Sequence, residues 1–402
     1  MSAAPAAANR LKRVAGGAQR LLKNAFEPSA AENSHKEPFS RELAKEIDHF
    51  ARQRRTSVSL KDILTHFSKD TADLKKQLVV SAEFLRNELP VRLAHRIAEL
   101  ENLPYGLSGK PQVAKVQSWY TKSFQDLRSF PAVKDAADDE NFTTLLQDIH
   151  HRHRNVVPVM AMGIAALKRD LPAGMSMDRL YDVHEFLDSF YMSRIGIRML
   201  IGQHIELHRP PRENYIGMIS TNCSPVQVAE DAIQDARAIC MRQYGHAPDV
   251  TVYGDPNFTF AYVPSHLNHM VFELVKNSLR AQNDHYEDAD VESPPVRVIV
   301  AEGNEDITIK VSDEGGGISR TGVSKIWTYL YTTATSPLEL LDQAGEGEDT
   351  PAALAGYGYG LPISRLYARY FGGDMQVIPM EGYGTDAYLH LNRLGNTQEP
   401  LP

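Results

Sequence analysis

Four polar side chains recur at helical spacing between residues 266 and 281 (HLNHMVFELVKNSLRA) and share one face of a predicted helix: His269, Glu273, Asn277 and Arg280. The apolar residues of the segment form a different face, suited to packing on a sheet. An Asn carbonyl is a hard oxygen ligand for Mg²⁺ that bridges to phosphates. A Glu one turn earlier can orient or deprotonate a hydroxyl, and a His before it can tune that Glu. The alternative is an ordinary solvated face with i,i+4 pairs.

A carboxylate ends the second pattern, DITIKVSDEGGGI at residues 306–318. Asp313 shares strand parity with Ile307, Ile309 and Val311, so we expect it on the buried side of a strand. A buried carboxylate needs a hydrogen-bond donor, and the exocyclic amine of adenine is one. The glycines at 315–317 permit close approach of a ligand. The alternative is a tight glycine turn after a strand.

Alternating glycines mark the third pattern, GYGYGLPISRLYARYFGG at residues 356–373. They lead into a predicted helix with Pro362 in its first turn, where proline is tolerated. Bare N–H groups at such a helix start can cradle phosphates. Glycine strings are common, but the order and spacing of the three patterns together indicate a nucleotide site. The phosphate-loop pattern GxxxxGK[ST] and the motifs HRD, DFG, GxSxG and HExxH are absent.

The elements that must position these residues fall into two parts. From 40 to 208 the apolar residues recur at helical spacing, most clearly in 79–97, 137–170 and 178–208. Pro90 and Pro158 are expected to kink their helices. Several long amphipathic helices with short breaks predict a helix bundle.

After RPPREN (209–214) strand patterns alternate with helices. β-rich runs at 296–300 and 307–311 flank Gly303 and Asn304, which predicts a hairpin. Helical patterns occupy about 225–243, 265–283 and 361–371. The predicted fold class is therefore α + α/β, with an N-terminal helix-bundle domain followed by a mixed α/β domain.

Composition excludes several other classes. The chain has 402 residues, is 42% hydrophobic and 23% charged, and carries a net charge of −8, which argues against sequence-independent nucleic-acid binding. No apolar run approaches the ~20 residues that cross a bilayer. Two cysteines without a CxxC pair exclude a disulfide framework and argue against a structural zinc site.

The N-terminus has a composition of its own. Residues 1–26 are Ala-rich and carry five basic residues and no acidic one, so that removing them takes the net charge from −8 to −13. This composition predicts a mitochondrial transit peptide, the alternative being a solvated tail. We expect a linker at 27–39, a regulatory helical bundle at 40–210, an ATP-binding domain at 211–395 and a short tail at 396–402.

The three patterns resemble the N-box and the two glycine boxes of the GHKL ATPase superfamily. This resemblance implies a Bergerat-type α/β sandwich, preceded here by a four-helix-bundle domain. Over about residues 40–394 the chain also resembles mitochondrial pyruvate dehydrogenase kinases, in segments such as SRLYARYFGGD, YTTATSP, FLDSFYMSRIGIRMLIGQH and RHRNVVPVMAMGI. The segment YIGMISTNCSPVQV and the 17 residues that follow Thr385 are more similar to a relative, the branched-chain 2-oxo acid dehydrogenase kinase.

The resemblance implies roles for individual residues. Glu273 matches the general base that activates a serine hydroxyl, with His269 as its modulating partner. Asn277 matches the Mg²⁺ ligand, and Asp313 matches the carboxylate that recognises adenine. The resemblance implies further nucleotide contacts at Arg280, Gly315, Gly317, Thr332, Gly356, Tyr357, Gly358, Tyr359, Gly360, Leu361 and Thr385.

In the helical part, the resemblance implies a regulatory pocket for pyruvate and dichloroacetate. Its residues are Tyr120, Ser123, His153 and Arg194. The chain departs from the family where His150 replaces a frequent Arg, Ser278 a usual Ala, and Glu314 a usual Arg.

The implied activity is phosphorylation and inactivation of the E1α subunit of pyruvate dehydrogenase by Mg-ATP in the mitochondrial matrix, with K⁺ as a further ion. The alternative substrate is the branched-chain complex. Implied partners are the lipoyl domain of the E2 core and a second copy of the chain; no nucleic acid and no membrane span are expected. A histidine kinase, an ATP-driven chaperone and a non-catalytic scaffold fit less well, since the chain lacks an HExxxP-like helix and room for transducer domains and keeps Glu273, Asn277 and Asp313.

Overall fold

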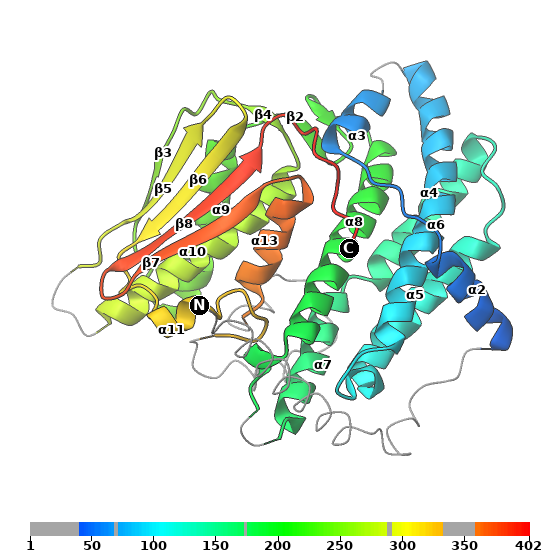
Figure 1. Ribbon diagram of the computed structural model, residues 1–402. Helices are drawn as coiled ribbons and strands as arrows, with labels where there is room; N and C mark the ends of the chain where they lie inside the picture. Colours follow the sequence, from blue (N-terminus) through cyan, green and yellow to red (C-terminus); the bar gives the residue numbers. More distant parts are fainter. Residues whose placement is uncertain (1–39, 68–70, 173–174, 288–291, 333–357) are drawn as a thin grey trace, which may run out of the picture.

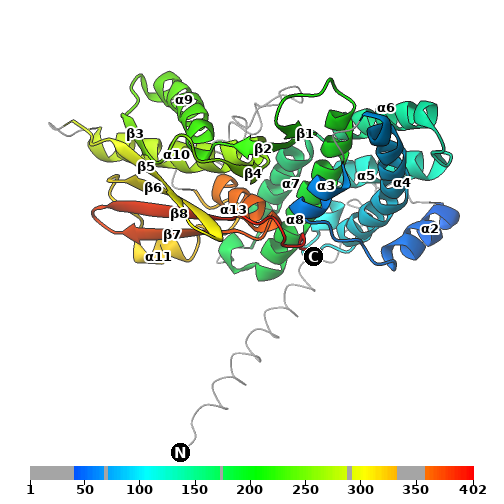
Figure 2. The same cartoon turned by 90° about the horizontal axis from the view of Figure 1, so that it is seen from above.

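The computed structural model describes residues 40–67, 71–172, 175–287, 292–332 and 358–402. A helical domain and an α/β domain lie side by side, with helices α8 (Tyr181–Leu207) and α13 (Gly360–Tyr370) in contact at their junction (Figures 1 and 2). The expected order of a helical domain followed by an α/β domain is confirmed. The expected leader at 1–26 and linker at 27–39 lie outside the described residues.

Helices of 7 to 31 residues build the first domain. They are α2 (Arg41–Ala51), α3 (Leu60–His66), α4 (Thr71–Glu101), α5 (Pro111–Ser129), α6 (Ala136–Arg152), α7 (Val156–Asp170) and α8, with short 3₁₀ turns at Leu107–Gly109 and Met177–Arg179. α4 packs against α2, α5, α6 and α8, and α5 also contacts α7. Their facing sides are apolar and fully buried, as at Leu89, Phe124 and Phe190.

The stretch 137–170 is two helices rather than one. α6 ends at Arg152 and α7 begins at Val156, so Pro158 lies in a first turn and does not kink a continuous helix as expected. The cause is proline itself, because its ring and missing N–H prevent a helical bond to the carbonyl four residues earlier. Pro90, in contrast, lies inside the single helix α4.

The second domain contains two sheets. Its strands are β1 (Tyr215–Ile216), β2 (Ile219–Cys223), β3 (Val250–Tyr253), β4 (Phe260–Tyr262), β5 (Val296–Glu302), β6 (Asp306–Asp313), β7 (Asp374–Met380) and β8 (Gly384–Asn392), and its helices are α9 (Pro225–Tyr244), α10 (Pro264–Tyr286), α11 (Arg320–Val323) and α13. A five-stranded mixed sheet has the order β3-β5-β6-β8-β7, and α9, α10 and α13 cover one of its faces (Figure 1). A small sheet has the order β1-β2-β4.

Strand register places the predicted carboxylate. β5 and β6 form the expected antiparallel hairpin, in which the Gly303 N–H donates to the Asp306 carbonyl at 2.9 Å. The apolar residues of β6 that share parity with Asp313 are all buried, and Asp313 itself is 6% exposed. Asp313 pairs with Thr385 of β8, and its strand β6 packs against α10.

A buried ion pair joins the two domains. Arg92 of α4 contacts both carboxylate oxygens of Glu399 (Nη2–Oε1 2.5 Å, Nη1–Oε2 3.1 Å), and the hydroxyl of Tyr370, at the end of α13, donates to Glu399 Oε2 at 2.8 Å. Arg92 also donates to Glu88 at 2.8 Å. On α8, a β-carbon at Gly196 would lie only 2.8 Å from Glu399 Oε2, so glycine leaves room for this contact. The segment around Glu399 thus ties α4 and α8 to the last turn of α13.

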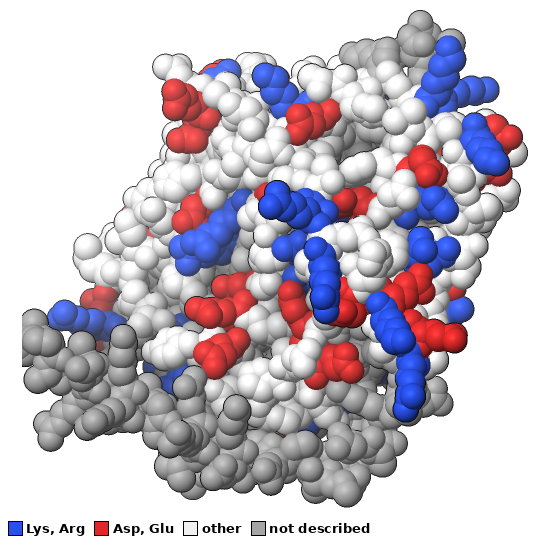
Figure 3. Space-filling model, turned by 45° about the vertical axis from the view of Figure 1, so that its right-hand side comes forward, with Lys and Arg blue, Asp and Glu red and all other residues white. Residues whose placement is uncertain are grey.

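Charges of both signs are interspersed over the face drawn in Figure 3. A mixed surface of this kind produces no strong single-sign field. Among the described residues, no helix combines the length and apolarity needed to cross a membrane.

Candidate active site

Glu273 lies on α10 and is buried at 4% exposure. One of its oxygens, Oε1, accepts a hydrogen bond from Lys276 Nζ at 2.6 Å. The other, Oε2, lies against the Cα of Gly360, because a β-carbon built at Gly360 would overlap it and would lie 3.0 Å from Glu273 Cδ. One oxygen is therefore held by a cation, and the other faces the start of α13.

The start of α13 is built from backbone alone. Gly358 has φ +73°, and a β-carbon there would lie 2.7 Å from the Tyr331 nitrogen, so both its conformation and its contacts require glycine. Among the described residues, no side chain caps the helix. The first N–H groups of a helix have no intrahelical acceptor, and the dipole makes this end attractive to anions. Here those groups lie beside the Glu273 carboxylate.

Asn277 follows Glu273 by one turn and is exposed. Among the described residues, its side chain makes no hydrogen bond that would hold it away from a ligand, whereas Arg280, a turn further on, pairs with Asp284 (Nε–Oδ2 3.3 Å). The helix therefore brings Glu273 and Asn277 to one face as expected, and Arg280 carries a partner of its own.

Three donors fix the Asp313 carboxylate. Ser278 Oγ donates to Oδ2 at 2.7 Å, and the N–H groups of Gly315 and Thr385 donate to Oδ1 at 3.1 and 3.2 Å. Burial raises the pKa of Asp313 above its usual value, while these hydrogen bonds act to lower it. A carboxylate held this way keeps a free lone pair for one further donor, such as an amine of a base.

The glycines after Asp313 let the loop pack closely. A β-carbon at Gly315 would lie 2.6 Å from the Ala281 carbonyl carbon of α10. Gly317 has φ +71°, and a β-carbon there would be 2.9 Å from the Gly384 carbonyl oxygen. These two positions of the first glycine pattern are therefore constrained by packing as well as available to a ligand.

The residues expected near the lid divide into three groups. Thr332 is the last described residue before the gap at 333–357, in which Gly356 and Tyr357 lie. The side chain of Tyr359 is 1% exposed and packs against Tyr329 and Tyr191, with ring centroids 5.2 and 6.1 Å apart. Tyr359 therefore points at the helical domain, and only its backbone is left for a nucleotide; Leu361 is half-buried on α13.

His269 precedes Glu273 by one turn and stacks edge-on against Tyr367, with ring centroids 5.0 Å apart. Burial lowers the pKa of His269, against the raising effect of Glu273, so the ring is neutral near pH 7. Its Nε2 is buried without a hydrogen-bond partner in the described structure. It lines a cavity of about 200 Å³ between the domains, with His150 of α6 and Arg198 of α8 among the other walls.

The four residues expected in the helical domain do lie together. His153 stacks on Tyr120 with ring centroids 4.6 Å apart, and its Nε2 is 2.9 Å from Ser123 Oγ. Arg194 Nη2 donates to the His153 carbonyl at 3.3 Å. All four side chains are buried, and burial lowers the pKa of His153 to about 3.

Three contacts were missed by the sequence analysis. Lys276, the partner of Glu273, sits at i+3 on the same helix, a spacing that could have revealed it. Ser278 was noted only as a departure from the family, yet it holds Asp313. Arg152 donates to Ser123 Oγ at 2.7 Å, and only the folded bundle brings them together. Another departure from the family, Glu314, pairs with Arg297 at 3.0 Å.

Comparison with known proteins agrees with this geometry. Residues 57–220 match the family of mitochondrial branched-chain alpha-ketoacid dehydrogenase kinases, and residues 262–394 match the histidine kinase-, DNA gyrase B- and HSP90-like ATPases.

Three curated relatives carry the name pyruvate dehydrogenase (acetyl-transferring) kinase, mitochondrial. The protein of Arabidopsis thaliana is 55% identical over 91% of this chain and 98% of its own length. The protein of Schizosaccharomyces pombe is 39% identical over 89% and 98%, and human isozyme 1 is 38% identical over 97% and 89%. The chain therefore belongs to the mitochondrial pyruvate dehydrogenase kinase family of GHKL ATPases.

Proposed function

We propose that this chain transfers the γ-phosphoryl group of Mg-ATP to a serine hydroxyl of the pyruvate dehydrogenase E1α subunit in the mitochondrial matrix, and so inactivates that enzyme. The observation that carries the proposal is the contact between Glu273 Oε2 and Gly360 at the start of α13. It brings a carboxylate that can accept a proton next to backbone groups that can bind phosphates.

The residues present fit a magnesium nucleotide. Asp313 would accept a hydrogen bond from the adenine amine, and the N–H groups at the start of α13 would bind phosphate oxygens. The exposed Asn277 would hold Mg²⁺, which, when bound, neutralises phosphate charge during transfer. Gly358 and Gly360 let the backbone at the start of α13 pack directly against Tyr331 and Glu273.

Glu273 would act on the incoming hydroxyl. Its Oε1 is held by Lys276, so the carboxylate is oriented and Oε2 is left to accept the serine proton as the oxygen attacks phosphorus. His269 is neutral and does not cancel the Glu273 charge, which keeps that carboxylate available as a proton acceptor. Positioning and charge neutralisation supply most of the rate enhancement in phosphoryl transfer.

Glu273→Gln tests the assignment. With ATP and purified pyruvate dehydrogenase complex, phosphoserine measured by mass spectrometry should form ~10²–10⁴-fold more slowly, because the general base is lost. Nucleotide affinity should be unchanged, and Glu287→Gln, an exposed change at the end of the same helix, should behave like the unaltered chain. Phosphorylation at the normal rate by the Glu273→Gln variant would refute the role of Glu273.

The choice of substrate is tested separately. Residues 57–220 match a family named for the branched-chain complex, whereas the curated relatives above are named for pyruvate dehydrogenase. Given equal amounts of both purified complexes, the chain should phosphorylate pyruvate dehydrogenase faster. Preference for the branched-chain complex would keep the chemistry and replace the substrate.

A homodimer and lipoyl-domain binding belong to the same proposal. β7 is an edge strand, and its Ile378 and Met380 are 57% and 65% exposed, so it offers an apolar edge for a second copy. Ile378→Lys should raise the dimer dissociation constant in analytical ultracentrifugation.

We assign binding of the E2 lipoyl domain to the helical domain. We assign binding of pyruvate to the cluster of Tyr120, Ser123, His153 and Arg194 in that domain, and we propose K⁺ as a further ion.

A further inference from the structure

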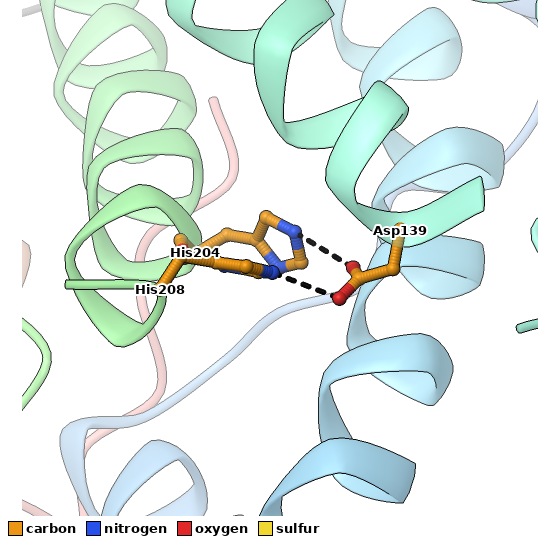
Figure 4. Close-up of side chains that lie close together, drawn as sticks. All are labelled: Asp139, His204 and His208. Atoms are coloured by element: carbon orange, nitrogen blue, oxygen red, sulfur yellow. Dashed lines mark hydrogen bonds and ion pairs between the residues drawn. The ribbon is translucent and has the colours of Figure 1, made fainter. Parts of the chain in front are cut away.

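A second cluster of polar side chains, all potential metal ligands, lies in the helical domain. It is away from the face of α10 that carries Glu273 and Asn277, which we call the nucleotide face. Asp139, in the first turn of α6, faces His204 and His208, which lie one turn apart at the end of α8 (Figure 4). The side chains of His204 and Asp139 are 0% and 5% exposed, and that of His208 is 18% exposed. The cluster is therefore largely buried and reaches solvent at His208.

The three donor atoms are close enough to share one ion. They all lie within 4.8 Å of one another, with His204 Nε2 3.3 Å from Asp139 Oδ1 and His208 Nε2 2.8 Å from Oδ2. In a tetrahedral zinc site with bonds of ~2.0–2.1 Å, donor atoms are separated by about 3.3 Å. Small side-chain shifts would therefore suffice to enclose an ion.

The outer nitrogens of both rings already have partners. His208 Nδ1 lies 2.9 Å from the His204 carbonyl, which can only accept, so Nδ1 carries a hydrogen. His204 Nδ1 lies 3.3 Å from Ser81 Oγ. Histidines that bind metals are oriented by such contacts at their other nitrogen, which direct Nε2 toward the ion.

The hydrogen-bond pattern of the cluster requires a cation between His208 and Asp139. With Nδ1–H of His208 engaged, its Nε2 lone pair faces a carboxylate oxygen at 2.8 Å, and two acceptors at that distance require a cation between them. Either a proton or a metal ion can supply it. In addition, Asp139 Oδ1 is buried and has only the long contact of 3.3 Å with His204 Nε2 among the described residues.

The hydroxyl oxygen of Thr143 lies close enough to be a fourth metal ligand. Thr143 Oγ1 lies 3.1 Å from His204 Nε2 and 3.3 Å from His208 Nε2. Its hydrogen is directed to the Asp139 carbonyl at 2.9 Å, which leaves its lone pairs facing the two histidines. Two imidazoles with oxygen donors favour a first-row transition metal over Mg²⁺ or Ca²⁺.

We propose that Asp139, His204 and His208 form a binding site for a divalent transition metal ion such as Zn²⁺, which fastens the start of α6 to the end of α8. The site is independent of the kinase chemistry, since none of its residues lies on the nucleotide face. Bound metal would stabilise the folded helical domain in proportion to the logarithm of its concentration, because the unfolded chain does not hold the three donors together.

The test uses the full chain without a polyhistidine tag, treated with chelator and then titrated with Zn²⁺ or Co²⁺ alone. One ion should bind per chain, Co²⁺ should give the visible absorption of a tetrahedral site, and Zn²⁺ should raise the unfolding temperature. His208→Gln and Asp139→Asn should each lower Zn²⁺ affinity at least 100-fold. His151→Gln, on an exposed histidine of α6, should leave it unchanged.

Ser81→Ala removes only the partner of His204 Nδ1 and should lower Zn²⁺ affinity about 10-fold, within the usual range for such partners. It carries the test if the ligand variants do not fold. The proposal is overturned if the unaltered chain binds Zn²⁺ no more tightly than His208→Gln or Ser81→Ala, or if Zn²⁺ leaves its unfolding temperature unchanged. The cluster is then an imidazolium–carboxylate pair. Neither result bears on kinase activity.

Discussion

The nucleotide face of α10 and the Tyr120–Ser123–His153–Arg194 cluster both combine a buried histidine with polar neighbours, but they differ in how far those neighbours satisfy one another. On the nucleotide face, Glu273 has one oxygen against Gly360, and Asn277 is exposed. In the helical cluster, Ser123 Oγ contacts His153, Arg152 and the Trp119 carbonyl at once.

This difference distinguishes a site whose polar groups are open to a ligand from a site whose polar groups are already bonded to one another. A polar group with an unused donor or acceptor facing an opening can bind a ligand without breaking an existing contact. A buried network whose groups already bond to one another stabilises the fold, and a ligand must displace some of those bonds. Variants on the nucleotide face should therefore change activity with little effect on stability, and variants in the helical cluster should do the reverse.

The largest effect, after that of Glu273→Gln, is expected for Asn277→Ala. Loss of the Mg²⁺ ligand should reduce kcat/KM for ATP by about 100-fold, in the range seen when a metal's supporting groups are lost. Because Asn277 is exposed, the free energy of unfolding should change by less than ~0.5 kcal/mol. Steady-state kinetics and urea unfolding measure the two. A large loss of stability would show that Asn277 supports the fold, as the residues of the helical cluster do, and would contradict the proposed difference between the two sites.

Ser278→Ala should lower both the affinity for ATP and the free energy of unfolding, because Ser278 is buried and donates a hydrogen bond to the Asp313 carboxylate. A hydrogen bond to a charged group contributes ~1.5–3 kcal/mol, so ATP affinity should fall about 10-fold or more, with some loss of stability. A double-mutant cycle with Asp313→Asn, read by calorimetric titration of ATP, isolates the coupling. Additive effects in that cycle would contradict a direct role of Ser278 at Asp313.

Ser123→Ala should lower stability instead. It removes one hydrogen bond from each of His153 and Arg152, at a net cost of ~0.5–1.5 kcal/mol per bond, while His153 keeps its contact with the Trp119 carbonyl and Arg152 keeps Asp126. KM for ATP should stay within about twofold of its normal value. Ser118→Ala, an exposed hydroxyl on the same helix α5, is the matched control. A changed KM with intact stability would show that the cluster communicates with the nucleotide face.

The last prediction concerns the dependence of stability on pH. His153 has a pKa of about 3 when folded, against an ordinary value of 6.5. Between those values the unfolded chain binds the proton and the folded chain does not, so stability falls as pH decreases from about 6 to 4, by ~1.4 kcal/mol per pH unit for this residue. His153→Gln should reduce that slope in urea unfolding. An unchanged slope would mean that His153 is protonated in the folded protein.

Local pattern was enough to predict the parts of the site that lie within one element. Strand parity placed Asp313 among buried residues, and helical spacing placed Asn277 one turn from Glu273. Contacts between distant segments could not be read this way. The bond from Ser278 to Asp313 spans 35 residues, and the direction of the Tyr359 side chain depends on Tyr191 in the other domain.

The bundle shows the same limit. Apolar residues at helical spacing lie on both sides of residues 153–155, so periodicity alone predicted one helix, whereas a second helix begins at Val156 with Pro158 in its first turn. The residues of the helical cluster came only from the family resemblance, because none of them stands out by type or spacing. Their mutual hydrogen bonds exist only once α5, α6 and α8 are packed.

The pairing of Arg92 with Glu399 has a consequence for how the chain folds. The two residues are 307 positions apart, yet each buries its charge against the other. Before Glu399 packs against Arg92, the guanidinium of Arg92 has only Glu88 as its counter-ion. An incompletely paired buried charge destabilises the fold. We therefore expect the helical domain to reach its final packing only after the sheet of the second domain has formed and delivered Glu399. The two domains should then unfold in one cooperative transition.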